Sequence, residues 1–148
     1  MAVDATERSR RTSALATDLG RLLRTAEREH AALVNDVLGA VPGKIRGYRI
    51  LVVAAQSAER QNHIGRRLGI DRTVLTYLID DLETAELVRR VPDPTDRRAH
   101  LIMITGHGRS VVCRLAERVA EVDGHFLAAL GPAEQIQFQA MVRRLATT

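Results

Sequence analysis

The chain has 148 residues, of which 45% are hydrophobic and 27% charged, with one cysteine and no tryptophan. This length fits one domain, or one small domain with an added dimerisation arm, and the balance is that of a globular protein and excludes a disordered tail. One cysteine cannot crosslink a fold, so nothing indicates an oxidising compartment. The longest apolar run, residues 50–55, is too short to span a membrane, and the N-terminal segment with Asp4 and Glu7 lacks the apolar stretch of a secretion signal. We therefore expect a cytoplasmic protein without membrane contact.

The excess of positive charge lies in the middle of the chain. Residues 41–110 contain twelve basic and eight acidic residues, whereas residues 1–40 contain six of each and residues 111–148 contain four of each. A local basic excess between two neutral flanks predicts that the central segment faces a polyanion.

Helical spacing of apolar residues characterises the first part of the chain. Residues 8–38 are predicted to form one long amphipathic helix, because leucine, alanine and valine recur on one face and charged residues on the other. Gly39, Pro42 and Gly43 end this helix. A shorter, nearly all-apolar helix over residues 48–55 is expected to be buried.

Two compact helices and two strands are predicted next. The helices join at residues 68–71, where Gly69 can adopt the left-handed backbone of a tight turn and Asp71 can cap the following helix. The apolar period then changes to two, which predicts strands over residues 88–91 and 101–105.

The segment between these strands is predicted to be a loop, and long helices follow. Residues 92–100 read PDPTDRRAH, a polar segment rich in proline and aspartate. Thr105 is expected to cap a helix over residues 106–130, and Pro132 occupies the first position of a last helix, where a missing N–H does no harm.

This order of elements predicts a mainly α fold with a small two-stranded β-wing, in which N- and C-terminal helices form a dimerisation domain. We assign residues 1–45 to an N-terminal dimerisation helix, residues 46–108 to a winged helix-turn-helix DNA-binding domain and residues 109–148 to C-terminal dimerisation helices. The long terminal helices cannot bury their apolar faces on so small a centre, which predicts a homodimer.

The second helix of the compact pair, residues 72–85, is predicted to be the recognition helix. Its core-facing positions follow helical spacing: Leu75, Leu78, Ile79 and Leu82. The outward positions are Thr73, Thr76, Tyr77 and Asp80, with Arg72 at the leading end. Hydroxyl, aromatic and guanidinium groups at a helix N-terminus can read a major groove and bind phosphate.

The wing is predicted to supply the second DNA contact. Arg97 and Arg98 are expected at the loop tip, where a long cationic side chain can enter a narrow minor groove. Because a bare carboxylate opposes DNA, Asp80 is expected to pair with a wing arginine and support it.

The stretch IGRRLGIDRTVLTYLIDDLETAELVRRVPDPTDRRAHLIMITGHGR resembles the DNA-binding core of the MarR (multiple antibiotic resistance regulator) family. Its most specific part is DPTDRRAHLIMIT, which is similar to the wing of that family. The resemblance implies a homodimeric transcriptional regulator of palindromic double-stranded DNA, in most cases a repressor. It also implies a small aromatic or anionic effector that binds between the dimer arms and the reading heads.

The resemblance also implies roles for particular residues, and the sequence departs from the family pattern at three positions. Thr73, Thr76 and Tyr77 match recognition-helix positions, Arg97 and Arg98 match the wing, and Asp80 matches an aspartate that supports a wing arginine. Three positions depart from the family pattern: Glu86 replaces a helix-ending glycine, Tyr77 stands where arginine is frequent, and Arg60 replaces a Ser/Thr cap.

Other chemistry finds little support in the sequence. Cys113 has no second cysteine as a partner, and its place on a helical apolar face predicts a buried structural thiol. The five histidines and the single cysteine show no metal-ligand spacing, so no metal or cofactor is expected. His30 is the one histidine considered for an effector pocket, against the alternative of a core histidine. No catalytic motif is found, so we do not expect an enzyme.

A different class of function stays open at this stage. The winged domain could serve as a protein-interaction module, or the chain could be a helical dimer that binds small molecules without sequence-specific DNA binding. The two adjacent arginines of the wing favour DNA.

Overall fold

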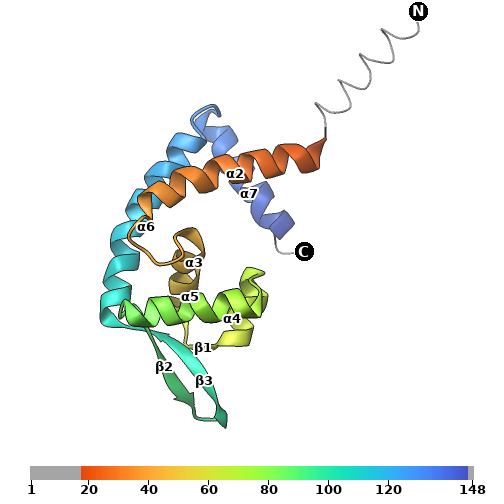
Figure 1. The fold of residues 1–148 in the computed structure, drawn as a ribbon. Helices are drawn as coiled ribbons and strands as arrows, with labels where there is room; N and C mark the ends of the chain where they lie inside the picture. The colour runs from red at the N-terminus through yellow and green to blue at the C-terminus, as the bar shows by residue number, and fades with distance from the viewer. Residues whose placement is uncertain (1–17, 147–148) are drawn as a thin grey trace, which may run out of the picture. The chain divides into compact units, whose positions relative to one another are not determined.

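The computed structural model describes residues 18–146, except for the side chain of Arg97. Figure 1 shows the elements, which are α2 Leu19–Val37, α3 Ile45–Gln56, β1 Glu59–Arg60, α4 Gln61–Leu68, α5 Arg72–Thr84, β2 Val88–Asp93, β3 Asp96–Ile104, α6 Gly106–Phe126 and α7 Pro132–Ala146. A β-hairpin that follows two short helices, with long helices on either side in the chain, confirms the predicted fold class. Residues 8–17 of the predicted first helix lie outside the described residues.

The chain divides into two compact units within α2, between Leu33 and Val34. The second unit contains every element from α3 onward and is described here by itself. The assignments of residues 1–45 and 109–148 to dimerisation, and of residues 46–108 to DNA binding, stay predictions.

The turn between α4 and α5 forms as its sequence predicts. Gly69 ends α4 with φ 62°, in the left-handed region that glycine adopts without steric cost. A carboxylate oxygen of Asp71 then accepts hydrogen bonds from the backbone N–H groups of Thr73, at 2.8 Å, and Val74, at 3.4 Å. The left-handed turn at Gly69 and the cap by Asp71 together fix the start of α5 at Arg72.

The wing is longer than predicted and belongs to a three-stranded antiparallel sheet in the order β1-β3-β2. The prediction that residues 92–100 form a loop is wrong, because β2 continues to Asp93 and β3 starts at Asp96. A hairpin that is solvated on both faces shows no apolar alternation, so its polar outer half resembles a loop in the sequence. The missed strand β1 has two residues, too few for any periodic signal.

The outer half of the hairpin is irregular. Pro92 pairs with His100, whereas the next residue, Asp93, pairs with Asp96, so residues 97–99 have no direct partners on β2. Such irregularities bend a strand and change the direction of its side chains. Arg97 and Arg98 therefore lie in this irregular part of β3, just after the turn, and not at the tip of a loop as predicted.

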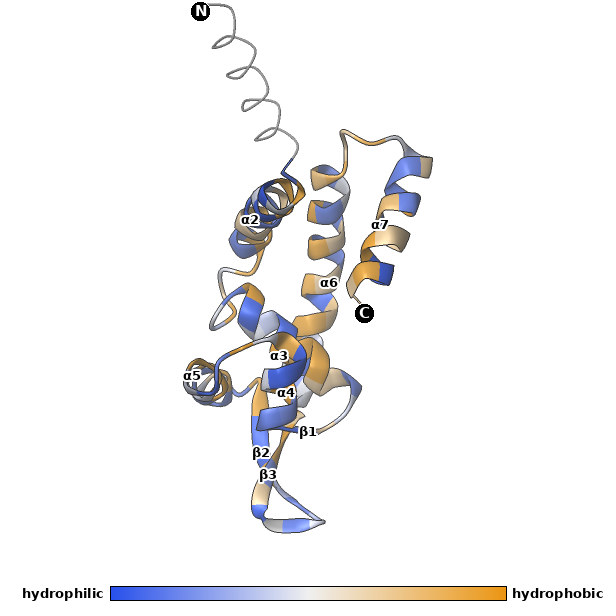
Figure 2. Cartoon of the chain, turned by 90° about the vertical axis from the view of Figure 1, so that its right-hand side faces the viewer, coloured by the Kyte–Doolittle hydropathy of each residue, from blue (hydrophilic) through white to orange (hydrophobic). Residues whose placement is uncertain are grey.

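One apolar core holds the second unit together. It consists of Val34, Leu38, Val41, Ile50, Leu51, Val53, Ala54, Ile64, Leu75, Ile79, Leu82, Leu87, Val88, Ile102 and Ile104. The three predicted core residues Leu75, Ile79 and Leu82 are buried, while Leu78 is half-buried at its edge. Figure 2 shows that the hairpin becomes hydrophilic toward its tip, so the wing extends from the core into solvent.

The end of α5, the start of β2 and the start of α6 meet in one tight joint. Glu86 adopts φ 57°, the left-handed backbone that a glycine would adopt there, and its carbonyl accepts a 2.6 Å hydrogen bond from the Thr105 hydroxyl. The Thr105 hydroxyl in turn accepts the backbone N–H of Gly108 and caps α6 as predicted. A Cβ on Gly108 would lie 2.0 Å from the carbonyl oxygen of Leu87, so α6 approaches β2 as closely as only glycine allows.

The first of the C-terminal helices is shorter than predicted. The helix predicted over residues 106–130 ends at Phe126, and α7 follows from Pro132. None of the described residues of α7 is buried. Among residues 18–146, no helix combines the length and the apolar character that crossing a membrane requires.

Candidate nucleic-acid interface

A groove of about 1010 Å³ lies between α4, the N-terminal end of α5 and the hairpin. Its basic lining residues are Arg60, Arg66, Arg72, Arg90, Arg98 and His100. The two acidic residues that line it, Asp71 and Asp96, already accept backbone hydrogen bonds at the turns that they stabilise. The groove is therefore positively charged overall and suits an anionic partner.

The first turn of α5 points the predicted contact residues outward. Arg72 and Thr73 are exposed, and 67% of the Tyr77 surface is accessible. Within the described part of the chain, no acidic side chain pairs with the guanidinium groups of Arg72 or Arg98. These side chains are available to bind phosphate or base edges, whereas the backbone N–H groups of Thr73 and Val74 are already bound by Asp71.

Thr76 is only half-buried, and its hydroxyl is engaged within the protein. It donates to the carbonyl oxygen of Arg72 at 2.9 Å and accepts a hydrogen bond from the Gln61 side-chain amide at 2.7 Å. The contact ties the first turn of α4 to the first turns of α5. Gln61 also lines the groove, and its role could not be predicted from the sequence because its partner is fifteen residues away.

Asp80 contacts an arginine of the hairpin, but this residue is Arg90 in β2 and not one of the two arginines near the turn. The Arg90 guanidinium lies 2.5 Å from a carboxylate oxygen of Asp80 and also binds Glu83. The backbone N–H of Arg90 donates to Glu83 at 2.8 Å, and this bond, with the guanidinium, lowers the pKa of Glu83. Arg90 thus joins α5 to the base of the wing, a role that sequence spacing could not reveal.

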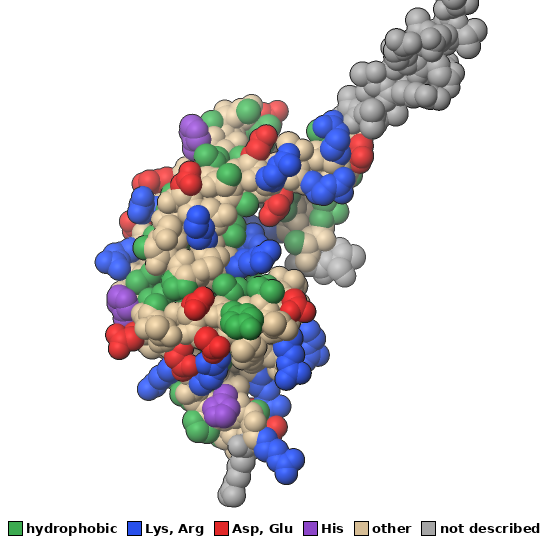
Figure 3. All heavy atoms as spheres, in the orientation of Figure 1, with side chains coloured by type: hydrophobic (Ala, Val, Ile, Leu, Met, Phe, Trp, Pro, Cys, Tyr) green, Lys and Arg blue, Asp and Glu red, His purple; other side chains and the backbone are tan. Residues whose placement is uncertain are grey.

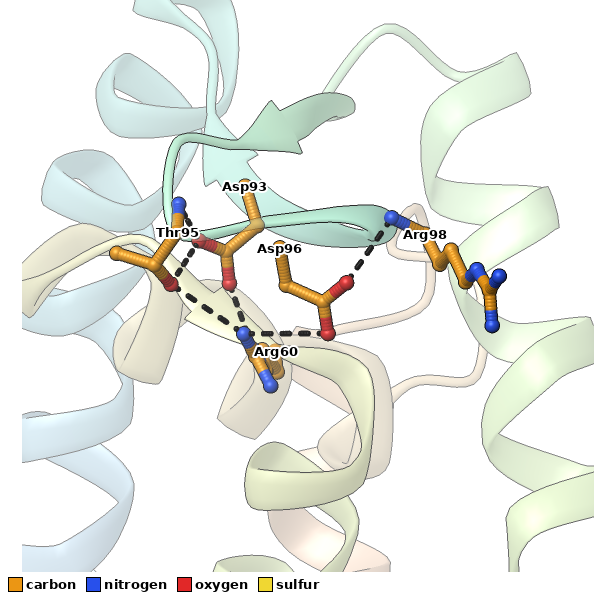
Figure 4. A network of polar contacts seen from close by, with 5 residues as sticks. All are labelled: Arg60, Asp93, Thr95, Asp96 and Arg98. Carbon is orange, nitrogen blue, oxygen red and sulfur yellow. Dashed lines mark hydrogen bonds and ion pairs between the residues drawn. The ribbon is translucent and has the colours of Figure 1, made fainter.

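The turn of the wing contains a compact polar cluster, shown in Figure 4. Asp93 accepts hydrogen bonds from the backbone N–H of Thr95 at 2.8 Å and from its hydroxyl at 2.6 Å. The Arg60 Nε donates to the other carboxylate oxygen of Asp93 at 2.6 Å. The hydrogen bonds from Thr95, followed by the one from Arg60, hold the pKa of Asp93 at about 2.

Arg98 follows directly after this cluster. Its backbone N–H donates to Asp96 at 3.0 Å, and its guanidinium points away from the cluster (Figure 4). The side chain of Arg97 lies outside the described residues, so its predicted contact stays a prediction. Figure 3 shows basic side chains gathered over α4 and the wing, while acidic ones gather toward the C-terminal half of α5. This polarity agrees with a partner that approaches the N-terminal end of α5.

The remaining candidates lie elsewhere. Cys113 is exposed, so the prediction of a buried thiol is wrong: the apolar face of α6 that packs on the core carries Val112 and Leu115, and Cys113 falls between them. His30 lies half-buried in α2, in the first unit, and its effector role stays a prediction. Across residues 18–146, no cluster of histidine, cysteine or acidic residues could hold a metal ion.

Comparisons with known proteins give a consistent result. A model of the MarR family matches residues 54–99, the segment from the end of α3 to the outer part of the wing. A transcriptional regulatory protein named for the hcr operon of Thauera aromatica is 28% identical over 136 residues, which is 88% of this chain and 80% of that protein.

Two solved structures share the fold over most of both chains. The regulator PcaV of Streptomyces coelicolor, solved in complex with its natural ligand, is 32% identical with a TM-score of 0.75, and the match covers 90% of this chain and 95% of that one. The repressor CouR of Rhodococcus jostii, solved on a 23-mer DNA duplex, is 25% identical with a TM-score of 0.81, and the match covers 89% and 94%.

The helix pair, the hairpin and the basic groove between them define a winged helix-turn-helix protein of the transcriptional-regulator class. Within that class, the chain belongs to the MarR family.

Proposed function

We propose that this chain is a homodimeric, ligand-responsive repressor that binds palindromic double-stranded DNA. The observation that carries the proposal is the basic groove between α4, the start of α5 and β3. In this arrangement α5 enters the major groove by its N-terminal end, where Arg72, Thr73, Thr76 and Tyr77 lie, and the wing presents Arg97 and Arg98 to the adjacent minor groove. CouR, which has the same fold, was solved on a DNA duplex, and this supports the proposed docking.

A second copy of the chain is the proposed occupant of its exposed apolar helix faces. On α7, Phe138, Met141, Val142 and Leu145 follow helical spacing and remain exposed. On α2, Leu19, Leu22 and Leu23 do the same. A soluble monomer rarely exposes such contiguous apolar surface. Two copies related by a twofold axis would present two identical reading heads, which explains a palindromic site.

Effector response is proposed to use a second cavity, of about 500 Å³, at the joint of α5, β2 and α6. Its apolar lining includes Leu38, Leu87 and Leu115, and its basic lining residues are His107, Arg114 and Arg118. An apolar pocket of this size with a few convergent cations suits a small organic acid. PcaV was solved with a natural ligand, which supports a ligand-responsive function. His30, in the first unit, stays a separate candidate for an effector contact.

The test is a fluorescence-anisotropy titration with labelled DNA from upstream of the chain's own gene, repeated at several salt concentrations. We expect binding that weakens with salt, and a salt slope that falls by about one for Arg98→Ala and for Arg72→Ala. Arg89→Ala is the matched control, because Arg89 contacts Met103 on the other face of β2 from Arg90.

The outcomes separate the classes of function. If the wild-type protein ignores double-stranded DNA at low salt, DNA binding is refuted and a protein-interaction or small-molecule-binding role is favoured. If it binds but both groove variants keep the wild-type salt slope, the groove is not the interface. Repression is tested by placing the upstream DNA before a reporter gene, whose expression we expect to fall when the protein is present.

A further inference from the structure

We propose that Arg60 is a positioning residue that fixes the wing against the helix pair and thereby sets where Arg98 meets DNA. This inference rests on the proposed DNA-binding function. It concerns a position where the chain departs from the resemblance, because the side chain that would cap α4 there is replaced by an arginine. The Arg60 side chain makes no capping hydrogen bond to α4 and reaches the wing turn in its place.

Arg60 holds the hairpin at two points. Its backbone pairs with Leu101 in the middle of β3, and it directly precedes the first residue of α4. Its guanidinium spans to the far end of the hairpin, where it binds Asp93 at 2.6 Å, the Thr95 hydroxyl at 3.4 Å and Asp96 at 3.7 Å (Figure 4). Two attachments along one hairpin fix its direction relative to α4, which one attachment would leave free to pivot.

The burial of Asp93 makes this bond more than a surface ion pair. Only 6% of the Asp93 side chain is accessible, compared with 32% of the Arg60 side chain. A charged carboxylate with so little contact with water needs partners that satisfy both oxygens, and Thr95 and Arg60 take one oxygen each. The same turn carries the Asp96 carboxylate that accepts the backbone N–H of Arg98. Arg60 is thus linked to the backbone that presents Arg98 by two consecutive polar contacts.

The alternative to a positioning role is that Arg60 binds a DNA phosphate directly. The contacts of its guanidinium argue against this alternative. The Arg60 guanidinium already faces two carboxylates, so the cluster of Arg60, Asp93 and Asp96 carries one net negative charge. The Nε–H of Arg60 is bound by Asp93 at 2.6 Å, so a phosphate would meet only the remaining N–H groups, next to two carboxylates that repel it. The cluster as a whole therefore adds no net positive charge, and we expect the benefit of Arg60 to come from placement of the wing.

The decisive variant is Asp93→Asn, because a positioning role of Arg60 and a purely electrostatic effect predict opposite changes in DNA affinity. Removing a negative charge beside DNA should strengthen binding if charge alone matters. If Arg60 positions the wing, the same change weakens the bond that holds the turn, and we expect affinity to fall roughly three- to tenfold. Asp81→Asn is the matched control, since it removes an exposed carboxylate from α5, and we expect it to leave affinity unchanged or higher.

Arg60→Gln and Arg60→Lys test the other partner, so the inference stays testable if one variant fails to fold. We expect both to lose affinity at an unchanged salt slope, because a positioning residue releases no counterion. The double variant Arg60→Gln/Asp93→Asn should bind as weakly as either single variant, since the two residues act through one bond. Circular dichroism melting of each variant shows that the titrations compare folded proteins.

Three results overturn the inference while DNA binding stands: stronger binding by Asp93→Asn, additive losses in the double variant, or a salt slope reduced by about one in Arg60→Gln. The last result would make Arg60 a phosphate contact. If the wild-type protein does not bind double-stranded DNA, the proposed function and this inference fail together.

Discussion

Asp93 is the single buried charged residue within the described part of the chain, and it should couple stability to pH. Its folded-state pKa of about 2 lies below the ordinary value of 3.8, so folding favours the ionised form. Asp93 therefore stabilises the fold at pH values above about 4, and this contribution is lost as the pH falls toward 2. The charged groups beside it are Arg60 and Asp96.

We predict that the wild-type protein and Asp93→Asn differ in free energy of unfolding, measured with urea, by an amount that depends on pH. We expect the wild-type protein to have the larger free energy of unfolding at pH 6, and the difference to shrink as the pH falls from 4 to 2. For Asp81→Asn, the difference in free energy of unfolding from the wild-type protein should not shrink as the pH falls. This variant removes a carboxylate that makes no described ion pair. A difference that stays constant over this pH range would mean that Asp93 titrates alike in the folded and unfolded chains.

Glu86 carries backbone strain that a single substitution should relieve. Its φ of 57° lies in the left-handed region, which costs a residue with a Cβ about 1 kcal/mol relative to glycine. Its N–H and carbonyl are held by hydrogen bonds to Glu83 and Thr105, so the backbone cannot relax. We expect Glu86→Gly to unfold at a higher urea concentration than Glu86→Ala, which keeps the Cβ but removes the same charge. Equal midpoints would show that the left-handed conformation costs nothing here.

Single residues could be predicted from the sequence where their role is local. The cap at Asp71 and the left-handed turn at Gly69 depend on neighbours within three residues, so the sequence identifies them. Arg60 and Asp93 are thirty-three residues apart, and their contact exists only because the hairpin has a particular length. The sequence predicts that Asp80 pairs with an arginine of the wing but does not tell which one, and the structure places Arg90 of β2 there.

At the scale of elements, the contact between α4 and α5 gives a prediction that separates stability from DNA recognition. The Thr76 hydroxyl bridges Gln61 and the Arg72 carbonyl, so Thr76→Val leaves the Gln61 amide without this partner while it conserves volume. We expect a loss of about 1 kcal/mol in the free energy of unfolding, whereas Thr76→Ser should keep both bonds.

The same pair of variants tests base readout by Thr76. If Thr76 only joins the two helices, Thr76→Ser keeps both the affinity and the preference among operator variants. If its methyl group packs on a thymine, as the outward position at the recognition helix allows, Thr76→Ser relaxes that preference at unchanged stability. Competition titrations with single-base operator variants distinguish the two results.

The elements also show where periodicity is informative. The helices α3, α5 and α6 bury one face each on a shared core, and their spacing gives their positions to within a few residues. The hairpin has a buried base and a solvated outer half, so periodicity predicts only its base. The outer part of the wing, which we propose contacts DNA, is the part that periodicity predicts least, because its residues are polar and solvated.

At the scale of the whole molecule, the exposed apolar face of α7 is the main ground for the proposed homodimer. An isolated helix of 15 residues is marginal in water, and α7 buries none of its described side chains. Its exposed stripe of Phe138, Met141, Val142 and Leu145 is therefore expected to be covered when the protein is assembled.

This argument predicts that Met141→Glu breaks the dimer, because two copies would each bury an unpaired carboxylate in an apolar contact. Ala140→Glu is the control, since it adds the same charge to an exposed position away from the stripe on the same helix. Sedimentation velocity should show a dimer for the wild-type protein and for Ala140→Glu, and a monomer at micromolar concentration for Met141→Glu. The monomer should also bind a full palindromic operator no better than a half-site, since it has one reading head. A Met141→Glu protein that remains dimeric would mean that α7 is not part of the interface, and the exposed stripe of α2 would then be the surface to change.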